Sequence, residues 1–219
     1  MAATASSLGE STRTKNMATR RNAILREARS LIAIEGFEAL KIRDLAEKAG
    51  LTVPTIYNLI GGKREILKTI IDDLVEQLRI IQTQAVAGSV EQSFANQIND
   101  LADHFAEDEP YFKAAFIAGD RSGLFEQSSD HGIFAHFVQQ PIDACKLAVQ
   151  EKLLRGNIPP EILGQQIYGC YRLARQDWAN GYFNLNQFKT QALTGIFLCL
   201  AADANPAFRT RLLKQIDAL

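Results

Sequence analysis

The sequence predicts an all-α protein, with a small three-helix unit at the N-terminus followed by a larger helical body. Three observations lead to this fold class. Apolar residues recur at i, i+3, i+4 and i+7 along most of the chain, which is the spacing of one helix face. Two short stretches of this kind flank Gly50, as in a helix-turn-helix. No convincing run of alternating apolar and polar residues predicts a strand.

The first three helices follow from their apolar stripes and their end signals. Helix one should occupy about residues 20–35, and helix two about residues 42–49. Helix three should open with Thr52 as its N-cap and carry Pro54 in its first turn, where a missing N–H costs little. The second helix of a helix-turn-helix lies in the DNA major groove. This segment therefore indicates DNA binding.

The rest of the chain predicts a long connecting helix and a helical body. Helix four should begin at Lys63 and continue past Leu78, before a break at residues 87–89. The polar, glycine-bearing stretch 119–132 should be mostly loop. Apolar stripes predict body helices over about residues 90–105, 110–116, 134–153, 161–181, 186–202 and 207–216.

Composition excludes several classes of protein. No apolar run approaches the roughly 18 residues that span a bilayer, and the N-terminus lacks the apolar core of a signal peptide. Three widely spaced cysteines favour reduced thiols and a cytoplasmic location. Residues 1–82 carry 13 Lys and Arg against 10 Asp and Glu, a balance of +3, whereas residues 83–219 carry 11 against 15, a balance of −4. This asymmetry fits DNA contact at one end.

Residues 24–67 resemble the N-terminal domain of the TetR family of bacterial transcriptional regulators. The matching marks are Gly36-Phe37, Asp44-Leu45-Ala46, Ala49-Gly50, Thr55-Ile56-Tyr57, and Lys63 with Glu65. The sequence departs from the family pattern at Lys41, Pro54, Ile60 and Gly62. Lys41 cannot cap helix two, which should weaken that helix by about 1 kcal/mol, whereas Glu65 can still reach back to Gly62.

The resemblance implies three regions. Residues 1–17 would be a mobile tail, residues 18–82 a helix-turn-helix DNA-binding domain, and residues 83–219 a helical regulatory domain that binds ligand and dimerises. The implied partners are a double-stranded DNA operator, a small-molecule effector of unknown identity and a second copy of the chain. No membrane partner and no cofactor are expected.

The resemblance and the chemistry of base recognition give a set of DNA-binding candidates. Tyr57 should bond a phosphate through its hydroxyl, as the family's tyrosine does, and Lys63 should meet a phosphate beside a helix N-terminus. Asn58 can read adenine in the major groove, although a solvated helix face would look similar. The full set is Lys41, Thr52, Val53, Pro54, Thr55, Tyr57, Asn58 and Lys63.

The body supplies candidates for a ligand pocket and for a dimer interface. Aromatic residues at helical spacing either fill a core or line a pocket, and the pocket candidates are Phe94, Tyr111, Phe116, Phe134, Phe137, Tyr171 and Trp178. The last two long helices carry more apolar surface than one thin body needs, and the family pairs these helices in a four-helix bundle. The interface candidates are Tyr168, Tyr171, Ala174, Trp178, Leu193, Ile196, Phe197 and Leu200.

The sequence thus predicts a sequence-specific regulator, expected to be a repressor that a small hydrophobic ligand releases from a near-palindromic operator. Two alternatives stay open: a helical ligand-binding protein that has lost DNA recognition, and an all-α enzyme. The enzyme alternative lacks support, because the sequence has no phosphate-binding glycine loop, zinc-protease motif or nucleophile elbow. His104, His131 and His136 do not have metal-ligand spacing, so neither a metal nor a catalytic residue is predicted.

Overall fold

A computed structural model describes residues 4–84, 88–125 and 133–219, with the side chains of residues 4–13, 84 and 133–136 left out of the description. Ten helices and no strand occur in these described parts, which confirms the predicted all-α fold. In order they are α1 (Thr4–Glu35), α2 (Ile42–Lys48), α3 (Val53–Leu59), α4 (Lys63–Gln84), α5 (Val90–Ala106), α6 (Glu109–Ser122), α7 (Ile133–Gln150), α8 (Pro160–Ala179), α9 (Leu185–Asp203) and α10 (Pro206–Asp217).

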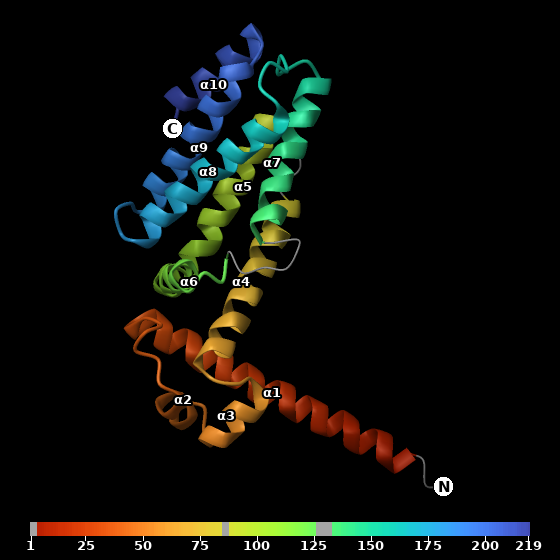
Figure 1. Cartoon of the computed structure of the whole chain (residues 1–219), viewed down its shortest axis with the longest axis vertical. Coiled ribbons are helices and arrows are strands. Elements are labelled where there is room, and N and C mark those ends of the chain that lie inside the picture. Colours follow the sequence, from red (N-terminus) through yellow and green to blue (C-terminus); the bar gives the residue numbers. More distant parts are fainter. Residues whose placement is uncertain (1–3, 85–87, 126–132) are drawn as a thin grey trace.

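The N-terminal head consists of α2 and α3 packed against the second half of α1 and the start of α4 (Figure 1). Its centre is apolar and closed to solvent: Ile24, Ile32, Leu45, Ile56 and Ile66 are fully buried. α1 begins at Thr4 rather than near residue 20, and its N-terminal part projects away from the head. Periodicity did not predict this extension, because the residues before Arg20 carry no apolar stripe.

α4 leaves the head as a continuous rod and becomes part of the body, as Figure 1 shows. In the body α8 packs between α7 and α9, while α5 and α10 also pack on α9. An aromatic cluster fills the centre, with Phe105 stacked on Trp178 at 4.9 Å between ring centroids. Such packing stabilises the body by burying large apolar surfaces.

The predicted loop over residues 119–132 is only partly correct. α6 continues through Gly119 to Ser122, and Gly123 ends it with a left-handed φ of 66°. Position 119 in this helix requires a glycine, because the Phe125 ring packs directly against its backbone. An added Cβ would lie 2.3 Å from the Phe125 Cε2. Residues 126–132 lie outside the described part of the chain.

Helix length and hydropathy show whether any helix could span a membrane. Among the residues that the structure describes, no helix is both long enough and apolar enough to cross a bilayer. This finding agrees with the absence of a long apolar run in the sequence.

Candidate nucleic-acid interface and ligand cavity

Local hydrogen bonds hold the helix-turn-helix in shape. α2 ends at a left-handed Gly50 (φ 64°), whose N–H donates to the Glu47 carbonyl. Thr52 caps α3 as predicted, because its Oγ1 accepts from the Thr55 N–H at 3.4 Å and lies 2.8 Å from the Thr55 Oγ1. These contacts orient the first turn of α3, which is the part of a recognition helix that meets base edges.

α3 presents part of the predicted DNA-binding set to solvent. Tyr57 is 55% exposed although it is a large aromatic residue. Thr52, Pro54 and Asn58 are exposed beside it, as is Lys41 at the start of α2. Val53 and Thr55 are less exposed, because Val53 packs against the core and the Thr55 Oγ1 lies 2.8 Å from the Thr52 Oγ1. An exposed aromatic next to polar side chains on the second helix is a surface suited to phosphate and base contact.

Lys63 is placed at the N-terminus of α4, but it is not a free cation. Its Nζ donates to the Glu38 carbonyl at 2.7 Å and lies 4.7 Å from the centroid of the Phe37 ring. The neighbouring Gly62 N–H donates to the Glu65 carboxylate at 2.9 Å, as the sequence predicted. An ammonium group has three donors, so Lys63 can keep its bond to the turn and still present an N–H to a phosphate.

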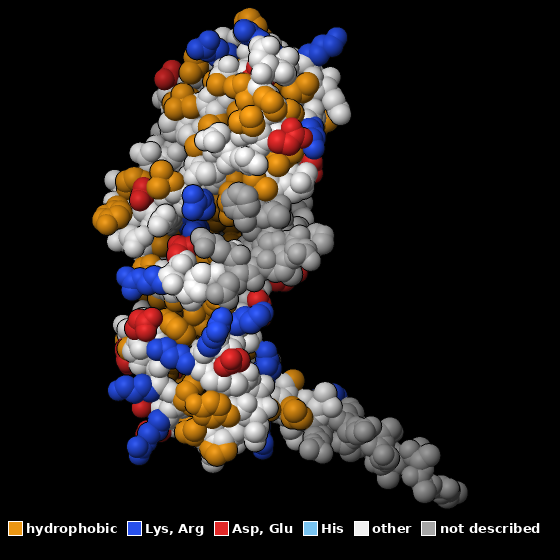
Figure 2. Space-filling model, viewed as in Figure 1, with side chains coloured by type: hydrophobic (Ala, Val, Ile, Leu, Met, Phe, Trp, Pro, Cys, Tyr) orange, Lys and Arg blue, Asp and Glu red, His pale blue; other side chains and the backbone are white. Residues whose placement is uncertain are grey.

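The head also exposes cations outside the predicted DNA-binding set. Arg43 and Lys48 on α2 and Arg64 on α4 are exposed. Lys and Arg side chains are spread over the lower part of the molecule in Figure 2. No sequence motif distinguishes these residues from solvated charges; they lie on the helices that precede and follow α3 in the head.

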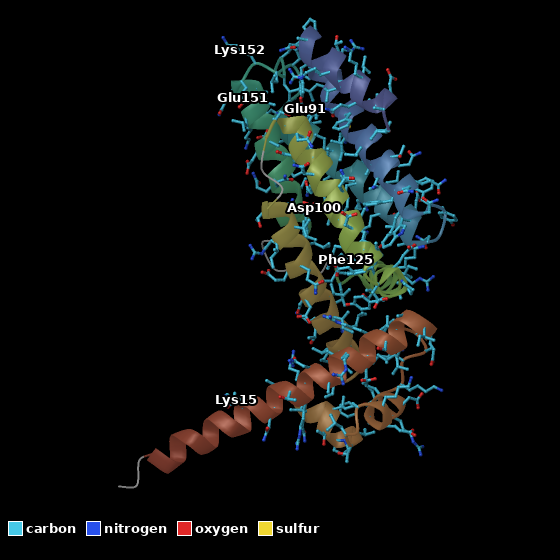
Figure 3. All side chains as sticks on the ribbon, turned by 180° about the vertical axis from the view of Figure 1, so that it is seen from behind. Lys15, Glu91, Asp100, Phe125, Glu151 and Lys152 are labelled. Carbon is cyan, nitrogen blue, oxygen red and sulfur yellow. The ribbon has the colours of Figure 1, made fainter. Side chains whose placement is uncertain are left out.

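A half-open cavity of about 270 Å³ lies in the body between α4, α6, α7 and α8. Its wall combines rings and aliphatic side chains with charged and hydroxyl groups: Val75, Leu78, Phe116, Asp120, Phe125, Phe137, Tyr168, Tyr171, Arg172 and Arg175. Phe125, labelled in Figure 3, follows α6 close to α4. An adjoining recess of about 30 Å³ is lined by Phe94, Phe137, Tyr171 and others.

Four of the seven predicted pocket residues therefore reach a cavity or its recess: Phe94, Phe116, Phe137 and Tyr171. Tyr111 and Trp178 are not among the lining residues. Tyr111 lies under Arg29 at the start of α6, and Trp178 is fully buried in the aromatic core. The side chain of Phe134 lies outside the description.

Arg175 is the most confined charged group of the cavity. Its side chain is 8% exposed and its Nη2 donates to both oxygens of Asp120, at 3.1 and 3.2 Å. The guanidinium lies 4.5 Å from the centroid of Phe116 and 5.4 Å from that of Phe125. Burial raises the pKa of Tyr168 and of Tyr171, so both hydroxyl groups remain neutral donors.

Comparison with known proteins agrees with this geometry. Residues 24–70, which span the helix-turn-helix, match the family model of bacterial regulatory proteins of the tetR family. The N-terminal part of the chain is therefore a TetR-type domain. This domain is of the kind that the sequence predicted, and the family consists of regulators rather than enzymes. No curated protein gives a significant match to the chain.

Solved structures of TetR-family proteins have the same fold at low sequence identity. A TetR-family transcriptional regulator from Pectobacterium atrosepticum is 19% identical, with a TM-score of 0.67 over 87% of this chain and 96% of that one. SmeT, the repressor of the Stenotrophomonas maltophilia multidrug efflux pump SmeDEF, is 16% identical, with a TM-score of 0.66 over 86% and 92%. SmeT is also known in a complex with triclosan.

NalD, the secondary repressor of the MexAB-OprM multidrug efflux pump in Pseudomonas aeruginosa, is 14% identical to the chain. Its TM-score is 0.62 over 84% of this chain and 97% of that one. At such identities the likeness shows a shared fold. The ligand and the operator have to be inferred from the residues of this chain.

The predicted dimer residues need a correction, because the structure places them inside the protomer. Ala174, Trp178, Leu193, Ile196, Phe197 and Leu200 are buried in the single chain, and Tyr168 and Tyr171 line the cavity. The outward faces of α8 and α9 carry other residues. On α8 these are Ile162, Gln166, Gly169, Leu173 and Gln176, and on α9 they are Gln187, Gln191, Thr194, Leu198 and Ala202.

This outward face of α8 and α9 has no charged residue at the ten positions just named. Its three large apolar side chains, Ile162, Leu173 and Leu198, are 51%, 60% and 53% exposed. An uncharged, partly apolar face on two adjacent helices is unusual for surface exposed to water and is typical of an interface. Sequence periodicity selected residues on the inward faces of these two helices, whereas the uncharged outward face is the one open to a partner.

Proposed function

We propose that this protein is a dimeric transcriptional repressor of the TetR family, which binds a near-palindromic DNA operator through α3 and is released by a small, largely apolar ligand. The observation that carries the proposal is the exposed face of α3. A 55% exposed Tyr57 beside the exposed Asn58 contributes nothing to the core of the head. On the second helix of a helix-turn-helix, such residues are positioned to contact a phosphate and a base edge.

The same proposal assigns the parts of the chain. Residues 18–82 would be the DNA-binding domain, residues 83–219 the regulatory and dimerisation domain, and residues 1–17 an extension before them. One helix-turn-helix contacts a single half-site, so two heads held about one helical turn apart are needed for a specific operator. The uncharged outer face of α8 and α9 would join the two protomers by a two-fold axis.

Helix α6 provides a physical connection from the cavity to the head. Near its C-terminal end, Asp120 pairs with Arg175 in the cavity wall. Near its N-terminal end, the Tyr111 ring lies 5.5 Å from the guanidinium of Arg29 on α1, and Arg29 also pairs with Asp73 of α4 at 3.1 Å. A ligand that moves α6 would thus change how α1 is held, and a coupling free energy of about 1–3 kcal/mol would weaken DNA binding about 5- to 150-fold.

Substitutions on α3 test the DNA-binding part of the proposal. The purified protein is titrated against labelled DNA from upstream of its own gene and against a scrambled sequence of the same length. Tyr57→Ala should weaken binding to both sequences, because a phosphate contact carries no sequence information. Asn58→Ala should weaken mainly the specific complex, by about 5- to 150-fold if the amide reads a base.

Tyr182→Ala is the matched control, since Tyr182 is a 75% exposed tyrosine between α8 and α9, far from α3 in sequence. It should bind DNA like the unaltered protein. If Tyr57→Ala and Asn58→Ala both bind the upstream DNA as tightly as the unaltered protein and the Tyr182→Ala control do, α3 is not the recognition helix. If the unaltered protein shows no preference for any upstream sequence, the chain fits the alternative of a ligand-binding protein without DNA recognition.

A further inference from the structure

We propose that the cavity between α4, α6, α7 and α8 takes a hydrophobic carboxylic acid, whose carboxylate binds Arg172 and Arg175 while its apolar body lies against the aromatic wall. The inference rests on the proposed function only in treating this cavity as the effector site. It goes further by naming the chemical class of the effector. Three features of the cavity carry it: unused guanidinium donors, a positive charge balance and an apolar far wall.

Some N–H groups of the Arg175 guanidinium have no protein partner, although the side chain is largely buried. Only its Nη2 is bonded, to Asp120. Among the described residues, its Nη1 and Nε have no hydrogen-bond partner, because the remaining contacts are with the Phe116 and Phe125 rings. Neither atom is among the enclosed side-chain nitrogens that lack a partner, so both can be reached from the cavity or from solvent. Donors left open toward a cavity are therefore placed for an acceptor that arrives with a ligand.

Arg172 gives the wall an excess of positive charge. It lies three residues before Arg175 on α8 and lines the same cavity. It has no ion-pair partner in the described part of the chain. Asp120 is the only carboxylate among the described lining residues, so two guanidinium groups face one acid. Arg172 is exposed, so its guanidinium lies at the rim of the cavity. Arginine binds carboxylates in a bidentate geometry, and a ligand carboxylate would offset the excess positive charge of this wall.

The rest of the wall is suited to a hydrocarbon or aromatic body. Val75, Leu78, Phe116, Phe125 and Phe137 are apolar and come from α4, α6, the segment after α6, and α7. The tyrosine hydroxyls of α8 can donate to the same carboxylate, since burial raises their pKa and keeps them protonated. At about 270 Å³ the space is near the lower end of ligand pockets, which favours a small acid.

A carboxylate at this position would compete with Asp120 for Arg175. Asp120 is two residues before the end of α6, so losing this ion pair would free the end of the helix whose other end contacts α1. A neutral ligand of the same shape lacks this competition. The acid group would therefore contribute both to affinity and to release.

The test compares acids with their own methyl esters. Full-length protein is titrated calorimetrically with benzoic, 2-naphthoic, 4-phenylbutyric, octanoic and decanoic acids and with the corresponding esters. At least one acid should bind about 10- to 150-fold more tightly than its ester, which is the contribution of a hydrogen bond to a charged group. Arg172→Gln should remove most of this difference, whereas Arg209→Gln, an exposed arginine on α10, should leave it unchanged.

The outcomes separate the ligand class from the proposed function. The class is overturned if no acid binds more tightly than its ester, or if the preference for the acid survives Arg172→Gln. Esters that bind tightly and weaken upstream-DNA binding would overturn the class but leave ligand release intact. Acids that bind with the expected preference but do not change DNA affinity would support the class and overturn ligand release.

Discussion

Placing a negative charge on the outer face of α8 and α9 should separate the protomers and abolish operator binding together. The double variant Leu173→Glu with Leu198→Glu is the direct perturbation, because these side chains are 60% and 53% exposed in the single chain. Neither contributes strongly to the protomer core, so the fold should survive. The substitution therefore reports on the interface and not on folding.

The expected magnitude follows from the exposed fractions. Full burial of a leucine side chain contributes about 1.5–3 kcal/mol. Burying the exposed 60% and 53% of two leucines from each protomer would then contribute about 3–7 kcal/mol per dimer. At about 1.4 kcal/mol per tenfold change, losing it would raise the dimer dissociation constant by roughly a hundredfold or more. Repulsion between the introduced carboxylates adds to this effect.

The assay is light scattering and sedimentation at micromolar protein, followed by titration of upstream DNA. The double variant should be monomeric, with an unchanged helical spectrum and weakened specific DNA binding. Leu147→Glu on α7 is the matched control, since Leu147 is a 48% exposed leucine outside this face, and it should remain dimeric. A double variant that stays dimeric and binds DNA normally would refute the assignment of this face.

Three further predictions concern single residues. Lys63→Ala should make the slope of log affinity against log salt shallower by about one unit. The control Lys68→Ala, which removes an exposed lysine paired with Asp72, should change the slope less. Equal slopes for the unaltered protein and both variants would show that Lys63 does not contact a phosphate. The hydrogen bond from Cys199 lowers the pKa of Cys170 to about 7. The rate of Cys170 alkylation, measured by peptide mass spectrometry, should therefore increase between pH 6 and 8 as the thiolate forms. A rate that increases only above pH 8.5 would contradict this. Gly164→Ala should lower the free energy of unfolding by about 1–3 kcal/mol, since an added Cβ would lie 2.6 Å from the Ile142 backbone nitrogen. A denaturation midpoint at or above that of the unaltered protein would show that α7 and α8 pack differently.

The head was predictable because its determinants are local. The Thr52 cap, the left-handed Gly50 and the Gly62–Glu65 bond each involve residues at most a few positions apart. Spacing and residue type are enough to predict such contacts. The side-chain contacts of Lys63 were not predictable, because its Glu38 partner is 25 residues away along the chain.

The body was predictable as a set of helices but not as a set of faces. Periodicity shows that a helix has an apolar side, but it does not tell whether that side meets its own core or a partner. α9 shows the difficulty, because Ile196 and Leu200 point inward while Leu198 and Ala202 point outward. The Arg175–Asp120 pair joins residues 55 positions apart, and only the fold brings them together at the cavity.

In the proposed repressor, two α3 helices of one dimer read two half-sites of one operator. Footprinting of the full-length protein on the DNA upstream of its gene tests it most directly. We expect two protected segments of related, inverted sequence, with centres one helical turn or a whole number of turns apart. Both segments should lose protection with Tyr57→Ala and with the Leu173→Glu, Leu198→Glu variant. Uniform or absent protection at every protein concentration, or a footprint that both variants leave unchanged, would contradict it.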